Sequence, residues 1–114
     1  MKSELVERLR KTEDYSLSNL TENKKDQVVA WICSNILPRK MPLYRFSSYR
    51  LKHLLQEDTN IYVTNDRFKE IMLLCGFYPV NANDINWFYR ISMKSPAIRK
   101  HQEEVKAIHV VKQR

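Results

Sequence analysis

The scarcity of glycine limits the folds open to this chain more than any other feature of its sequence. Gly76 is the single glycine among 114 residues. Antiparallel sandwiches and barrels need many tight turns, and tight turns need glycine at positive φ. The sequence therefore favours a mostly helical α+β fold over an all-β fold. A chain of this length supports one hydrophobic core, so we expect a single domain over residues 1–114.

Apolar residues at helical spacing, together with capping residues, predict five helices and one β-hairpin. Gly76 follows the fourth helix, where a left-handed C-cap is expected. Two β-prone runs predict the hairpin, and Trp87, Tyr89 and Ile91 share one face of its second strand. We place the helices at residues 3–11, 22–37, 48–57, 65–75 and 95–110, the strands at 77–80 and 86–92, and loops at 15–21 and 38–46.

The order of the middle elements, two short helices followed by a hairpin, is that of a winged helix-turn-helix domain. In that fold the second helix of the pair enters the major groove of DNA, and the hairpin loop touches the backbone or the minor groove. We therefore divide the chain into an N-terminal helix and loop (1–20), a winged-helix-like core (22–94) and a C-terminal helix or tail (95–114).

The net charge of +7 is concentrated in two blocks. Residues 39–55 hold five basic side chains and no acidic one, and residues 91–114 have a net charge of +4. Such blocks create a local field whose commonest partner is a polyanion, which indicates nucleic-acid binding. The alternative is that the charge only keeps the surface solvated.

Base reading needs hydrogen-bond donors and acceptors, and phosphate binding needs cations. Aromatic side chains among the basic residues would stack on unpaired bases, the alternative being that they anchor the connector to the core. We expect the outward face of the second helix to carry Asn65, Asp66, Arg67, Lys69, Glu70 and Leu73. The predicted contacts to single- or double-stranded DNA are Arg39, Lys40, Arg45, Arg50, Lys52, Asn65, Arg67, Lys69, Arg90 and Lys94, with Tyr44, Phe46 and Tyr49 for base stacking.

No catalytic site can be recognised in the sequence, so we expect a protein that is not an enzyme. His53 and Glu57 are four residues apart on one helix, but such polar pairs are common on exposed helix faces. A glycine-rich phosphate loop and a His and Cys spacing typical of metal sites are both missing, so neither a cofactor nor a metal is expected. Cys33 and Cys75 lie in apolar helical patterns, which is typical of reduced core thiols in the cytoplasm.

The sequence also bears on membranes and protein partners. It contains no apolar run near the ~20 residues that span a bilayer, and its charged N-terminus is not typical of a secretory signal. We therefore expect a cytoplasmic protein without membrane contact. A second hypothesis accounts for the same charges: a protein-binding module or inhibitor that engages an acidic protein. The C-terminal helix has few apolar residues and would complete its core against a second chain, as a homodimer or a hetero-complex.

A central block of the chain, residues 44–97, resembles small proteins encoded by phages and other mobile genetic elements of Gram-positive bacteria. The resemblance implies a setting of replication, transfer or host takeover. In that setting we expect a DNA-binding accessory to an element-encoded replication protein or primase, or an inhibitor of a host factor. The residues that carry it are Ser48-Tyr49, Leu51-Lys52-His53, Tyr62-Val63-Thr64-Asn65, Phe68, Gly76-Phe77 and Asn86-Trp87.

Overall fold

The computed structural model describes residues 2–112, with their side chains as far as residue 108. Met1, Gln113 and Arg114, which the domain prediction includes, lie outside the described residues. The elements follow in the order α1 (Lys2–Arg10), α2 (Glu13–Ser16), α3 (Glu22–Asn35), β1 (Pro38–Leu43), α4 (Ser48–Thr59), α5 (Asn65–Leu74), β2 (Tyr89–Ile91) and α6 (Pro96–Lys112). The predicted mostly helical α+β fold is confirmed.

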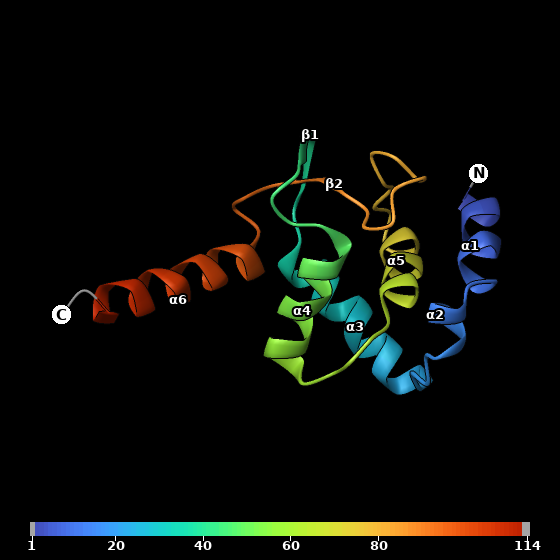
Figure 1. Ribbon diagram of the computed structural model, residues 1–114, viewed down its shortest axis with the longest axis horizontal. Helices are drawn as coiled ribbons and strands as arrows, with labels where there is room; N and C mark the ends of the chain where they lie inside the picture. The colour runs from blue at the N-terminus through green and yellow to red at the C-terminus, as the bar shows by residue number, and fades with distance from the viewer. Residues whose placement is uncertain (1, 113–114) are drawn as a thin grey trace.

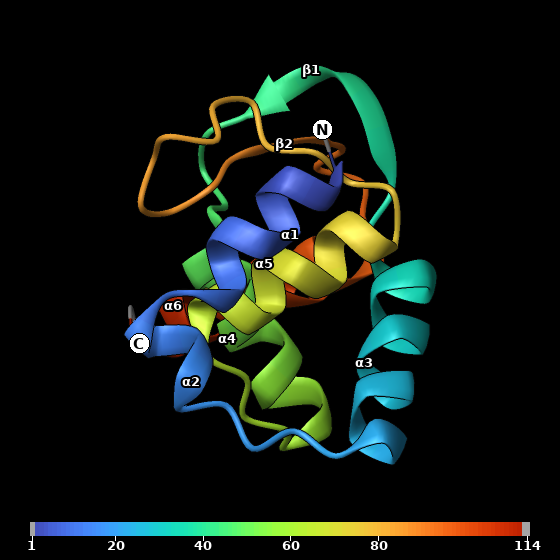
Figure 2. The same ribbon diagram turned by 90° about the vertical axis from the view of Figure 1, so that its right-hand side faces the viewer.

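Helix α5 is the centre of the helical part, because α1, α2, α3 and α4 all pack against it (Figures 1 and 2). Phe68, Ile71 and Met72 form its predicted inner face and are fully buried. Leu73 was expected to face outward, and that expectation is wrong. The residue is buried because α1 packs on this side of α5.

The predicted end of the α5 helix is confirmed at Gly76, which has a φ of 91°. The Gly76 N–H donates to the Leu73 carbonyl at 3.0 Å, and the Phe77 N–H donates to the Met72 carbonyl at 2.9 Å. These two bonds are the Schellman arrangement, which satisfies carbonyls that the helix end would otherwise leave unpaired. Glycine is needed here because positive φ places the Cβ of other residues in strain.

The sheet differs from the predicted hairpin. Strand β2 pairs in antiparallel register with β1, a segment expected to be a loop, through Pro38 opposite Ile91 and Leu43 opposite Tyr89. The predicted partner, residues 77–80, contributes an isolated bridge from Pro79 to Tyr89. Proline has no N–H to donate to a neighbouring strand, but an edge strand such as β1 tolerates that loss. This explains why a segment that contains prolines can still form a strand.

Helices α2 and α6 also refine the predictions. The expected loop over residues 15–21 begins with the end of the short helix α2. Helix α6 begins as expected at Pro96 and extends away from the rest of the molecule (Figure 1). Its first turn is anchored by buried Ala97 and Ile98, whereas Val105 is 52% exposed and Ile108 is 56% exposed.

Candidate nucleic-acid interface

Pairing of β1 with β2 joins two parts of the chain that contain no acidic residue. Residues 27–56 and residues 85–102 hold nine Lys and Arg side chains between them and no Asp or Glu. The two strands lie side by side at the top of Figure 1. Because β1 and β2 are paired, the cations of these two segments come close together and reinforce the positive potential along the sheet.

Six of the cations predicted to bind nucleic acid are exposed on the two strands, on the segments that follow them and in the first turn of α4, and we call them the ribbon cations. None of them forms an ion pair with any carboxylate among residues 2–108. Two of them bond locally to carbonyl groups: Arg50 Nη1 donates to the Arg45 carbonyl at 2.7 Å, and Arg39 Nη2 donates to the Pro42 carbonyl at 3.4 Å. The ribbon cations are Arg39, Lys40, Arg45, Arg50, Arg90 and Lys94.

The three aromatic residues predicted to stack on bases fall into two classes. Tyr44 is 64% exposed and its ring meets the Phe88 ring edge-on at 5.4 Å, and Tyr49 is 49% exposed. Phe46 is only 2% exposed, so its ring is not accessible to a base. It supports the interface indirectly, because the Arg50 guanidinium stacks over it at 4.4 Å.

Lys52, also predicted as a contact, is buried against the protein. Its Nζ lies 4.9 Å from the centre of the Tyr62 ring and 5.1 Å from that of Tyr49. Burial lowers the pKa of Lys52, because the charged form loses hydration. The expectation that this residue belongs to an exposed basic face is therefore wrong. A long aliphatic stem can pack on aromatic rings, which the residue type alone does not reveal.

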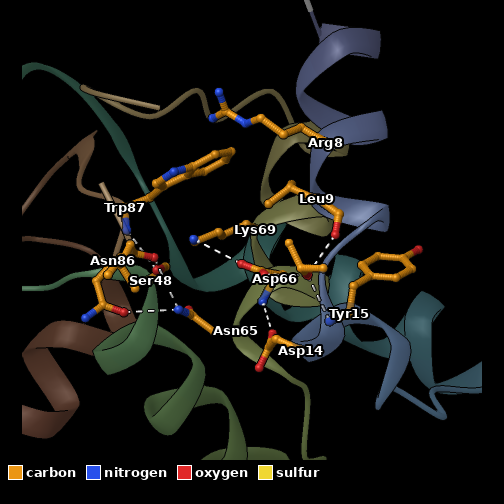
Figure 3. Close-up of polar contacts among 12 residues, drawn as sticks. Arg8, Leu9, Asp14, Tyr15, Ser48, Asn65, Asp66, Lys69, Asn86 and Trp87 are labelled. Carbon is orange, nitrogen blue, oxygen red and sulfur yellow. Dashed lines mark hydrogen bonds and ion pairs between the residues drawn. The ribbon is translucent and has the colours of Figure 1, made fainter. Parts of the chain in front are cut away.

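The outward face expected for α5 is covered by α1 and α2 (Figure 2). Lys69 is 5% exposed, lies over the Trp87 ring at 5.1 Å and forms an ion pair with Asp66 at 3.1 Å (Figure 3). Arg67 Nη1 donates to the Tyr15 hydroxyl at 2.8 Å. Asn65 Nδ2 donates to Asn86 Oδ1 at 3.0 Å. The sequence did not reveal this cover, because α1 and α2 are more than fifty residues away from α5 along the chain.

Glu70 is the electrostatic centre of the covered face. The side chain is nearly fully buried, and its carboxylate accepts from Arg10 Nε at 2.7 Å and from the Tyr15 hydroxyl at 3.0 Å. Arg67 Nε lies 3.3 Å from the same carboxylate. Hydrogen bonds and the charge of Glu70 raise the pKa of Arg10 above its ordinary value. The cations of α5 are thus neutralised inside the protein, in contrast to the ribbon cations.

The segment between Gly76 and β2 is attached to the starts of both α4 and α5. The Ser48 N–H donates to the Trp87 carbonyl at 2.7 Å, and the Trp87 N–H donates to Ser48 Oγ at 3.0 Å. Together with the Asn65–Asn86 bond, these contacts hold the end of the turn against the helices (Figure 3). Arg90 in β2 and Lys94 after it follow directly on this attached segment, so their backbone positions are held by the contacts with α4 and α5.

A groove beside the ribbon cations separates the start of α4 from α6. It has a volume of about 470 Å³ and is lined by Arg45, Phe46, Arg50, His101, Val105 and Lys106, among others. Its lining combines apolar Phe46 and Val105 with basic Arg45, Arg50 and Lys106. Such a lining suits an anionic ligand that also carries an apolar group.

Across the described part of the chain, no three His, Cys, Asp or Glu side chains lie together in a way that could hold a metal ion. Among residues 2–112, no helix has both the length and the apolar character that crossing a bilayer requires. Cys33, expected in the core, is exposed on α3.

Comparison with known proteins finds no matching family model, no matching curated protein and no matching solved structure.

Proposed function

We propose that this protein is a non-enzymatic, cytoplasmic DNA-binding accessory protein of a mobile genetic element, and that it binds the phosphate backbone through the ribbon cations. The observation that carries the proposal is the set of six exposed cations without a carboxylate partner among the described residues. Lys and Arg side chains that neutralise phosphates release the counterions condensed on DNA, and this release supplies most non-specific affinity for DNA.

The order and pairing of the elements support a winged helix-turn-helix interpretation. The elements follow in the order α3, β1, α4, α5, the return through Pro79, and β2. Strand β2 lies between β1 and Pro79, because it pairs with both. A winged-helix domain has the same succession, with a strand between its first two helices that pairs with the last strand. The turn at residues 81–87 would then be the wing.

The setting of the proposal comes from the resemblance of residues 44–97 to phage and mobile-element proteins. A small basic protein in that setting would assist an element-encoded replication protein or primase on DNA. In our proposal the ribbon cations supply the attachment to DNA, and exposed Tyr44 and Tyr49 stack on bases where the strands are separated.

The test is fluorescence anisotropy with a labelled 20-base-pair duplex and its single strand, at low and at physiological salt. The variant Arg39→Gln/Lys40→Gln/Arg90→Gln removes three ribbon cations. The control Lys2→Gln/Lys11→Gln/Lys24→Gln removes three exposed cations from α1, α3 and the segment after α1. We expect saturable binding that the first variant weakens at least tenfold and the control leaves nearly unchanged. Equal effects of the two variants, or no binding by the unmodified protein, would refute the proposal.

Helix α6 favours a second candidate function, binding to an acidic protein or to a second copy of the chain. Val105 and Ile108 are exposed on this projecting helix, and the basic groove lies at its base. The variant Val105→Asp/Ile108→Asp would abolish such an association and leave DNA binding intact. Analytical ultracentrifugation of the protein, alone and with a candidate acidic partner, distinguishes these functions.

A further inference from the structure

The contact between α5 and the first two helices, which we call the N-terminal cover (residues 2–16), has an apolar part at Leu9, with partly buried Leu5 and Val6, and a polar part. Thr12 Oγ1 donates to Asp66 Oδ2 at 2.7 Å, and the Asp66 N–H donates to Asp14 Oδ2 at 2.7 Å. Arg10 and Tyr15 both bond Glu70. Leu9 is the one residue of the two helices that is buried, among those the structure describes.

A helix face that stays buried permanently is normally apolar, and α5 has such a face in Phe68, Ile71 and Met72. The face under the cover includes buried Leu73, but it also carries the charged residues Asp66, Arg67, Lys69 and Glu70. The Arg10–Glu70 pair joins the cover to α5, and it contributes little net stability because Arg10 is 59% exposed to screening solvent and the Glu70 carboxylate is desolvated. The polar face is therefore suited to two states: one closed by the N-terminal cover, and one open to water or to a polar ligand.

The start of α5 carries a second sign of an open state. Thr64 is in the N-cap position but its side chain makes no capping hydrogen bond, and its hydroxyl is buried without a partner among the described residues. The Asp14 carboxylate bonds the helix start in its place (Figure 3). Backbone N–H groups at a helix start bind carboxylate and phosphate alike. Asp14 thus occupies a position that a DNA phosphate could take.

We propose that the N-terminal cover masks a second duplex-DNA contact surface on α5, formed by Asn65, Arg67, Lys69 and the helix start, and that duplex DNA displaces the cover. The inference rests on the proposed function, because the ribbon cations supply the first attachment. Asn and Arg side chains hydrogen-bond adenine and guanine edges, and Asp66 and Glu70 would accept from cytosine amino groups. Displacement of the cover would therefore add base readout by α5 to the phosphate contacts of the ribbon cations.

The opening variant is Arg10→Gln/Asp14→Asn, which weakens the cover at two contacts and leaves the net charge unchanged. The reporter is Lys69→Gln, since Lys69 bonds Asp66 and makes no hydrogen bond to the cover. Duplex binding is measured by anisotropy at one salt concentration for each variant, for the combination, and for Lys24→Gln as the matched loss of one charge. Circular dichroism establishes that each variant is folded.

We expect the opening variant to bind duplex at least fivefold more tightly than the unmodified chain. Lys69→Gln should weaken the opened protein about fivefold and leave the closed protein within twofold, whereas Lys24→Gln should have little effect on either. Equal effects of Lys69→Gln in both backgrounds would overturn the inference. If the inference failed but the Arg39→Gln/Lys40→Gln/Arg90→Gln variant lost binding, the proposed function would still stand. If no form of the protein bound DNA, both the inference and the proposed function would be refuted.

Hydrogen exchange of the unmodified protein provides an independent measurement, and it decides the matter if the opening variant does not fold. Saturating duplex should increase amide exchange across residues 2–16, because these helices lose their contacts with α5. Unchanged or slower exchange in residues 2–16, with slower exchange confined to the ribbon, would overturn the inference.

Discussion

Raising the salt concentration provides the most quantitative test of the proposed phosphate contacts. Each phosphate neutralised on duplex DNA contributes about −0.9 to the slope of log K against log salt. If all six ribbon cations make such contacts, the slope is about −5. Between 50 and 200 mM salt the affinity should then fall about 10³-fold. A single strand contributes about −0.7 per phosphate, so the same six contacts give a slope near −4.

The variant Arg39→Gln/Lys40→Gln/Arg90→Gln leaves three of these cations, so its slope on duplex should be close to half, about −2.7. The control Lys2→Gln/Lys11→Gln/Lys24→Gln should keep the full slope, because its three cations lie away from the ribbon. Anisotropy titrations at four salt concentrations measure all three slopes with one labelled duplex. A slope near zero in the unmodified protein, or equal slopes in the two variants, would refute the assignment of the phosphate contacts.

Three further predictions concern single residues. Gly76→Ala should lower the free energy of unfolding by about 1–2 kcal/mol in urea titrations, because φ is positive at this C-cap and an added Cβ would meet no atom that compensates. Tyr89→Phe should raise it by about 1 kcal/mol, because the buried hydroxyl has no partner among the described residues. Burial also raises the pKa of Tyr89 well above 10, so the unmodified protein should lose stability as the pH rises past 10, and Tyr89→Phe should reduce that loss. Burial raises the pKa of Cys75 to about 11, so mass spectrometry after brief iodoacetamide treatment at pH 8 should show modification at exposed Cys33 well before Cys75.

Local patterns in the sequence account for every helix except the short α2. The apolar spacing that includes Phe68, Ile71 and Met72 identified α5, and Gly76 marked its end, because both signals depend on residues within a few positions of one another. Strand β1 escaped prediction for the opposite reason. Its pairing with β2 joins residues about fifty positions apart, and its prolines are typical of loops.

The candidate site was predictable in the same uneven way. The run of cations without acids from Arg39 to Arg50 predicted an exposed basic surface, and those cations are exposed. The exposure of Lys52 and Lys69 was mispredicted, because their surroundings come from elements that pack in three dimensions. Lys52 lies between two tyrosines, and Lys69 lies on a tryptophan beneath the N-terminal cover. No local pattern distinguishes a buried lysine of this kind from an exposed one.

The acidic and basic side chains are segregated in this structure, and our proposal accounts for that segregation. Asp66 and Glu70 neutralise cations of α5, and Asp14 bonds the start of that helix, whereas no carboxylate among the described residues pairs with the ribbon cations. Charge that served only solubility would be as effective with both signs interspersed. Segregation favours a polyanion that meets the ribbon first, since long-range attraction acts before short hydrogen bonds form. In our proposal, the contacts of Asp66 and Glu70 with the cover keep α5 closed until the ribbon cations have bound DNA, so backbone attachment would precede base readout.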